Sequence, residues 1–253
     1  IIENIFDIKI VKKKNFNNDF ENISYLKSKN IIELRNKKLS DVILNFLLKL
    51  KVKSNKIKIL KLIKNHDKFF YNQKNLKNNY GGIGYNNSLF IYVFLNHLNL
   101  DLILESGVWK GYTTLLFDQY IKKTKKISFD INFENLQYKS HSTEYVEDDI
   151  ENYKFRERKN FSNTLAFFDD HISQYDRLSF ANKKKIKYLI FDDDINLSAV
   201  HSDGWPAIPT ISMVVDKSNI KKFDWKSINK DASANFSKKK FDNILKNYIY
   251  LKS

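Results

Sequence analysis

The fold of this chain is decided by the stretch Leu104-Glu105-Ser106-Gly107-Val108-Trp109-Lys110-Gly111-Tyr112-Thr113-Thr114. An apolar run ends at Glu105, and a segment with helical character begins after Gly111. Gly107 allows a tight turn in which the backbone approaches a ligand, and Gly111 allows close packing where the helix starts. We therefore predict a strand, a ligand-binding turn that includes Trp109, and a helix. A plain strand–helix turn of another α/β protein is the alternative.

Short apolar runs that end in acidic residues follow one another from residue 100 onward, with helix-like segments between them. These runs are Leu102–Leu104, Ile127–Phe129, Tyr145–Val146, Leu165–Phe168 and Tyr188–Phe191. Strands that alternate with helices predict an α/β fold of the Rossmann-like, doubly wound type with a mostly parallel sheet. In such sheets ligands bind at the carboxyl ends of the strands, which is where the acids fall.

The region before the glycine turn is predicted to be a separate, mainly helical accessory region over residues 1–80, followed by the Rossmann-like domain over residues 81–253. Ser40 is predicted to cap a helix over residues 41–50, and a second helix is expected over residues 56–66. An apolar helix is expected over residues 86–97. Beyond residue 210 we expect one or two strands and a basic terminal helix.

Composition excludes several classes of protein. Hydrophobic residues make up 42% of the 253 residues, which is enough for a core and excludes a fully disordered chain. The absence of Cys excludes disulfide scaffolds, Cys-ligated zinc and thiol catalysis. No stretch approaches the roughly 18 apolar residues of a membrane helix. The first residues lack the features of a signal peptide, so we expect a cytoplasmic protein with no membrane span.

The formal net charge of +15 is spread along the chain as lysines among Asn and Ile. This distribution favours solvated lysine faces over a nucleic-acid surface, and nucleic acid is not expected as a partner.

The glycine turn distinguishes two classes of cofactor. A dinucleotide needs G-x-G-x-x-G, whereas this turn is G-x-x-x-G preceded by Glu105. A carboxylate repels pyrophosphate and attracts the sulfonium and amino groups of S-adenosylmethionine, so we predict the latter cofactor. Asp130 stands where an acceptor for ribose hydroxyls belongs, with a surface acid or helix cap as the alternative. Asp149 is the candidate acceptor for the adenine amino group, and Asp148 and Glu147 compete for that role.

The glycine turn, the acid that ends the second strand and the acid after the third resemble class I S-adenosylmethionine-dependent methyltransferases. The stretch Glu105–Gly111 in particular looks like the E-T-G-V-W-R-G turn of the macrocin O-methyltransferase (TylF) family. The resemblance covers roughly residues 80–200. It implies that residues matching Glu105, Gly107 and Asp130 bind S-adenosylmethionine and that a methyl group is transferred to a hydroxyl of a sugar or another small molecule.

Two consecutive predicted strands end in further acids, in Phe168-Asp169-Asp170-His171 and in Phe191-Asp192-Asp193-Asp194. Adjacent strands lie about 4.8 Å apart, so these carboxylates are expected to converge and to repel one another. A hard divalent cation such as Mg²⁺ or Ca²⁺ would relieve that repulsion. Helix capping and solvated loop tips are the alternative.

The resemblance implies a magnesium ion held by Asp169, Asp192 and Asp193. The chain departs from the family, which has Asp-Gly-Asp where Asp169-Asp170-His171 stands. A cation would orient two acceptor oxygens and lower the pKa of the attacking hydroxyl. Asp170 and His171 are the candidate catalytic residues, with His171 either a general base or a structural histidine. Arg177, on the next predicted helix, is expected to be exposed, with an ion pair to a nearby acid as the alternative.

The leading hypothesis is an S-adenosylmethionine-dependent, magnesium-assisted O-methyltransferase with a small-molecule or saccharide acceptor. Two alternatives stay open. A metal-dependent glycosyl or phosphoryl transferase would bind a nucleotide diphosphate, which Glu105 opposes. A non-enzymatic basic α/β binding module would show steep salt dependence of binding to nucleic acid or an anionic surface. A homo-oligomer is also left open.

Overall fold

The computed structural model describes residues 29–72, 83–155, 160–195, 207–216, 222–226 and 231–251. The predicted boundary between the accessory region and the Rossmann-like domain lies outside these ranges. None of the helices in the described part of the chain is long and apolar enough to cross a membrane.

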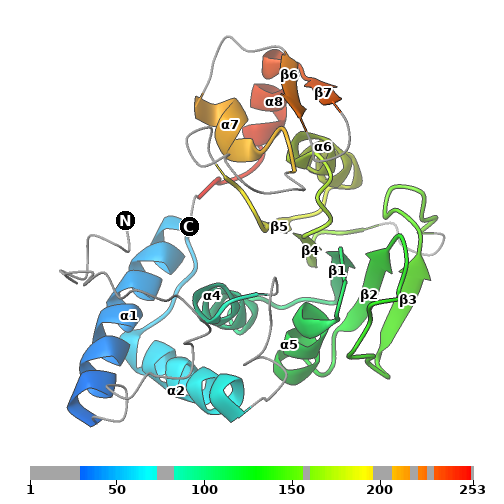
Figure 1. The fold of residues 1–253 in the computed structure, drawn as a ribbon. Coiled ribbons are helices and arrows are strands. Elements are labelled where there is room, and N and C mark those ends of the chain that lie inside the picture. The colour runs from blue at the N-terminus through cyan, green and yellow to red at the C-terminus, as the bar shows by residue number, and fades with distance from the viewer. Residues whose placement is uncertain are drawn as a thin grey trace, which may run out of the picture.

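Five parallel strands form the central sheet, in the order β3-β2-β1-β4-β5 (Figure 1). The strands are β1 (Leu102–Ser106), β2 (Lys125–Asp130), β3 (Thr143–Glu147), β4 (Thr164–Phe168) and β5 (Tyr188–Phe191). Each pairing in this sheet is parallel, which confirms the Rossmann-like α/β prediction. The strand order reverses between β1 and β4. This switch point is where open α/β sheets bind ligands.

The two central strands, β1 and β4, are buried along their whole length. Strands buried on both faces are continuous apolar runs, and this is why the sequence identified them so clearly. Side chains alternate between the faces: Leu102 and Leu104 belong to one core cluster, whereas Ile103 belongs to another. The same alternation sends Glu105 and Ser106, at the end of β1, to opposite faces.

Helices cover both faces of the sheet, as the doubly wound prediction requires. The helices α4 (Tyr85–Leu95) and α5 (Tyr112–Tyr120) pack on the face of Ile103. Helix α6 (Gln174–Lys184) packs on the opposite face through Phe180 and Ala181.

Two helices before the sheet, α1 (Lys29–Lys49) and α2 (Lys56–Asn72), share an apolar cluster with α4. Both are longer than predicted. The prediction that Ser40 caps a helix is wrong, because α1 begins at Lys29 and Ser40 is buried within it. The Ser40 hydroxyl donates to the Lys37 carbonyl at 2.7 Å, a bond by which a serine is accommodated inside a helix.

The chain after β5 forms α7 (Ile211–Asp216), an antiparallel pair of β6 (Lys222–Lys226) with β7 (Asp231–Asn235), and α8 (Lys238–Leu245). The predicted strands and basic terminal helix are thus confirmed. Apolar residues of α7 and α8 pack on α6, where Tyr175 and Leu178 contact the cluster of Met213 and Phe241. In Figure 1 this group lies beside α6, on the far side of the sheet from α1 and α2.

Candidate cofactor and metal site

The turn after β1 depends on two glycines with positive φ, Gly107 at +89° and Gly111 at +81°. A Cβ on Gly107 would lie 2.2 Å from the Asp169 carbonyl oxygen, and one on Gly111 would lie 2.3 Å from the Tyr138 carbonyl oxygen. Both contacts are with backbone, which cannot move aside as a side chain can. The turn is therefore packed directly against the segment that follows β4, at Gly107, and against the segment between β2 and β3, at Gly111.

Asp130, at the end of β2, holds this turn. Its Oδ2 accepts the backbone N–H groups of Val108 at 2.8 Å and Trp109 at 2.9 Å. Among the described residues, its Oδ1 accepts only a long bond of 3.4 Å from the N–H of Asn132. The ring of Trp109 is 42% exposed, and the ammonium of Lys110 lies 4.0 Å from the ring centroid. Contact of Asp130 with a ribose stays a prediction, for which Oδ1 is the available oxygen.

Glu105 is 1% exposed and faces α5. Its Oε2 accepts the hydroxyls of Thr114 on α5 and Ser128 on β2, each at 2.6 Å. Its Oε1 has no hydrogen-bond partner among the described residues. Burial raises the pKa of Glu105 to about 7, because the charged form loses its hydration. Direct contact of Glu105 with a cofactor stays a prediction, since the side chain has almost no exposed surface.

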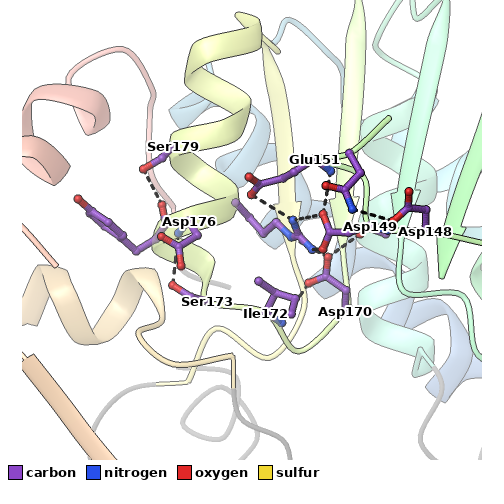
Figure 2. A network of polar contacts seen from close by, with 12 residues as sticks. Asp148, Asp149, Glu151, Asp170, Ile172, Ser173, Asp176 and Ser179 are labelled. Carbon is purple, nitrogen blue, oxygen red and sulfur yellow. Dashed lines mark hydrogen bonds and ion pairs between the residues drawn. The ribbon is translucent and has the colours of Figure 1, made fainter. Parts of the chain in front are cut away.

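The prediction that Arg177 is exposed is wrong. Its side chain is 2% exposed, and its guanidinium contacts three carboxylates (Figure 2). Both oxygens of Asp149 accept from Arg177, at 2.9 and 2.6 Å. Glu151 accepts at 3.2 Å and Asp170 at 2.8 Å. Asp149 therefore has donors on both oxygens, and its predicted contact with adenine stays a prediction.

Asp170, a predicted catalytic residue, is also held by neighbours. Its Oδ2 accepts from Arg177 and from the hydroxyl of Ser106, and its Oδ1 accepts the N–H of Ile172 at 3.2 Å. A carboxylate that accepts from a guanidinium, a hydroxyl and a backbone N–H has donors on both of its oxygens. This environment suits a structural ion pair, and a catalytic role for Asp170 stays a prediction.

Donor atoms of Asp169, His171 and Asp193 lie within 4.8 Å of one another at the carboxyl ends of β4 and β5. His171 Nδ1 is 3.9 Å from Asp193 Oδ2. Asp192 lines the same shallow pocket but is not in this donor group. Asp194 is directed elsewhere, since its Oδ2 accepts the hydroxyls of Ser212 and Tyr250.

The charges in this pocket are poorly balanced. Within the described ranges, no Lys or Arg pairs with Asp169 or Asp192. Partial burial, together with repulsion from Asp192 and Asp193, raises the pKa of Asp169 to about 9. The pKa of Asp192 is raised for the same two reasons, burial and the neighbouring Asp193. Oxygen donors with no Lys or Arg partner among the described residues are of the kind that a divalent cation takes, and the predicted cation stays a prediction.

For Arg177 the less favoured of the two sequence interpretations, an ion pair with a nearby acid, is the one the structure shows. A signal was present, because Arg177 precedes Phe180 and Ala181 by three and four residues, and both of these are buried. That spacing places Arg177 on the buried face of α6.

Comparisons with known proteins give no family. A scan against protein-family models gives no match, and no curated protein matches the chain. A solved structure described as "cmcI-N160 SAH" is 16% identical, with a TM-score of 0.39, over 45% of this chain and 63% of that chain. This chain thus spans less than two thirds of the length of that protein.

Two further structures have comparable similarity. A putative S-adenosylmethionine-dependent methyltransferase from Listeria monocytogenes is 14% identical with a TM-score of 0.36, over 62% of this chain and 78% of that one. The plantazolicin methyltransferase BpumL in complex with SAH is 14% identical with a TM-score of 0.31, over 63% of this chain and 58% of that one. At identities and TM-scores this low, the likenesses assign no activity to this chain.

Proposed function

We propose that this chain is an S-adenosylmethionine-dependent methyltransferase that acts, with a divalent cation, on a hydroxyl of a sugar or another small molecule. One observation carries the proposal. The glycine turn after β1 is in backbone contact with Asp169, so the predicted cofactor turn and the predicted cation ligands share one edge of the sheet. A methyl donor on the turn would lie next to an acceptor bound at the pocket.

Three features of the chain fit the cofactor. The unpartnered Oε1 of Glu105 is a buried carboxylate oxygen whose ionised form a nearby positive charge would stabilise. Asp130 has one weakly engaged oxygen beside the turn. Trp109 offers an exposed ring at the same place. In this proposal Asp130 contacts ribose, and Glu105 acts through the turn that it supports.

The cation site of the proposal consists of Asp169, His171 and Asp193, with Asp192 in the same pocket. This set differs from the one that the family resemblance implies by including His171. Two carboxylates and an imidazole suit Mg²⁺ less well than Mn²⁺ or a related transition metal, because imidazole is a softer donor. A bound cation would supply acidity to the acceptor hydroxyl and hold neighbouring oxygens of the acceptor.

Calorimetric titration with S-adenosylmethionine, with and without Mg²⁺ or Mn²⁺, tests the cofactor assignment. We expect saturable heat at ligand concentrations below about 1 mM. A Glu105→Gln variant should bind more weakly, whereas Glu134→Gln, at an exposed acid, should bind as the parent does. No heat from the folded parent under any of these conditions would contradict the proposal.

Titration with Mn²⁺, followed by electron paramagnetic resonance, tests the cation site. Asp169→Asn and His171→Ala should each weaken Mn²⁺ binding by about tenfold or more, since each removes a proposed ligand. Asp176→Asn, at an exposed acid of α6, is the matched control. If His171→Ala keeps the Mn²⁺ affinity but loses turnover, His171 is the general base and not a ligand.

A second candidate is favoured by the burial of Glu105. The sequence argument against a nucleotide diphosphate relied on this carboxylate facing the ligand, and the structure turns it toward α5. Metal-dependent glycosyl or phosphoryl transfer therefore stays open. Titration with uridine or adenosine diphosphate and Mn²⁺ distinguishes the two: diphosphate binding without S-adenosylmethionine binding would favour this candidate.

A further inference from the structure

Arg177 connects three segments that the chain brings together from far apart. The residue is on α6, Asp149 follows β3, and Asp170 follows β4. In the sheet, β2 and β1 lie between β3 and β4, and the segment that carries Asp149 meets α6 on the sheet face, where Ile150 and Phe180 share a core cluster. Figure 2 shows Asp149, Glu151 and Asp170 converging on one side chain of α6.

Burying a guanidinium this deeply is unfavourable unless several hydrogen-bonded carboxylates compensate for its lost hydration. Asp149 supplies a two-pronged partner, which matches the planar fork of arginine. Asp170 binds Nε, on the other side of the group. A lysine carries the same charge but a single nitrogen, so it cannot make these contacts at the same time.

Asp170 connects Arg177 to the backbone of the pocket through hydrogen bonds. Its carboxylate also accepts from Ser106, the last residue of β1, and the Asp169 N–H donates to the Ser106 carbonyl at 2.8 Å. The residues on either side of Asp170 are Asp169 and His171, two of the three donors of the candidate cation site. His171 has a φ of +55°, which an ordinary side chain rarely adopts without support from its surroundings.

We infer that Arg177 is a positioning residue for the cation site: it holds Asp170 and Asp149, and thereby fixes the backbone that presents Asp169 and His171. This inference rests on the cation site of the proposed function. It also divides the acids of this edge by role. Those that contact Arg177 are neutralised by protein, whereas Asp169, which pairs with no Lys or Arg among the described residues, belongs to the candidate cation site.

The test is Mn²⁺ affinity measured by electron paramagnetic resonance on Arg177→Lys. We expect binding about tenfold weaker than in the parent, the effect typical of losing a residue that orients metal ligands. Arg35→Lys is the matched control, because Arg35 pairs with Asp67 and is largely buried but lies in α1. That variant should keep the Mn²⁺ affinity within about twofold of the parent. A folded Arg177→Lys protein with the parent's affinity would overturn the inference.

Should Arg177→Lys fail to fold by circular dichroism, Asp149→Asn takes its place. This variant weakens the ion pair that holds Arg177 without changing a proposed metal ligand. We expect Mn²⁺ affinity to fall by about threefold. Parental affinity in Asp149→Asn, or a parent that binds no Mn²⁺, would overturn the inference. Mn²⁺ binding with the expected variant pattern but without S-adenosylmethionine binding would refute methyl transfer and leave the role of Arg177 supported.

Discussion

Glu105 makes the stability of the fold depend on pH at the scale of one residue. Its pKa is about 7 in the fold against 4.5 when solvated, so the folded state binds the proton more tightly. Stability from this group is complete below pH 4.5 and is lost as the pH rises through about 7. Urea unfolding should show Glu105→Gln gaining stability relative to the parent between pH 5 and pH 8, on the order of 3 kcal/mol. Glu134→Gln, at an exposed site, should show no such gain.

Gly107 should tolerate no side chain. Alanine there would place a methyl group against the Asp169 carbonyl and force a positive φ on a residue that resists it. We expect Gly107→Ala to cost about 2 kcal/mol or more in thermal unfolding. Gly84→Ala is the matched control, because nothing lies within 4 Å of the added carbon. That change should cost less than about 1 kcal/mol, and equal losses in the two variants would contradict the packing described for the turn.

The candidate site residues could be named from the sequence, whereas their hydrogen-bond partners could not. Glu105, Asp130, Asp169 and Asp193 were chosen as candidates because each follows an apolar run, and their roles stay predictions. Their contacts were not predicted. The hydrogen bonds that Thr114, Ser128 and the backbone N–H groups of the glycine turn donate depend on how segments distant in sequence pack together. The charge of Arg177 suggested exposure, and only the carboxylates from two loops explain its burial.

At the scale of elements, the cap of α6 is a place where one hydroxyl decides helix stability. Ser173 accepts the N–H of Asp176 at the helix start, whereas Ser179 donates to the Tyr175 carbonyl within the helix (Figure 2). We expect Ser173→Ala to cost about 1 kcal/mol in urea unfolding. Ser179→Ala should change stability by less than about 0.5 kcal/mol. A larger loss of stability in Ser179→Ala than in Ser173→Ala would show that Ser173 is not the cap in solution.

The strands were predicted well because buried parallel strands leave a continuous apolar signal, as in β1 and β4. The start of α1 was not predicted, because its first residues include exposed apolar side chains such as Ile31 and Leu34 and the sequence offered Ser40 as a plausible cap. In such a segment, packing against α2 and α4 determines the helix, and the local pattern does not contain that information.

For the molecule as a whole, positive charge is concentrated in α1 and α2 and the segment between them. Residues 29–72 contain twelve Lys and Arg but only three acids, Glu33, Asp41 and Asp67. The sequence interpretation, an even spread of solvated lysines, overlooked this concentration. This concentration of positive charge would attract an anionic surface, if the chain is a basic binding module, or an anionic acceptor, if it is an enzyme.

Retention on heparin tests whether the lysines of α2 govern binding to a polyanion. Changing the exposed Lys61, Lys64 and Lys68 of α2 to Glu should lower the salt concentration of elution. The control changes three exposed lysines elsewhere, Lys122, Lys123 and Lys187, and alters the net charge equally. Similar shifts in the two variants would show that net charge, and not its location, governs binding.

The pairing of β1 with β4 has a consequence for synthesis. Leu102 is in register with Thr164, so one flank of the central strand has no hydrogen-bonding neighbour until some sixty further amino acids have left the ribosome. Parallel pairing across such a separation is slow, because a long loop must close first. During that interval the nascent chain presents an apolar template to other chains. Aggregation during translation, more than unfolding of the finished protein, is where this topology is vulnerable.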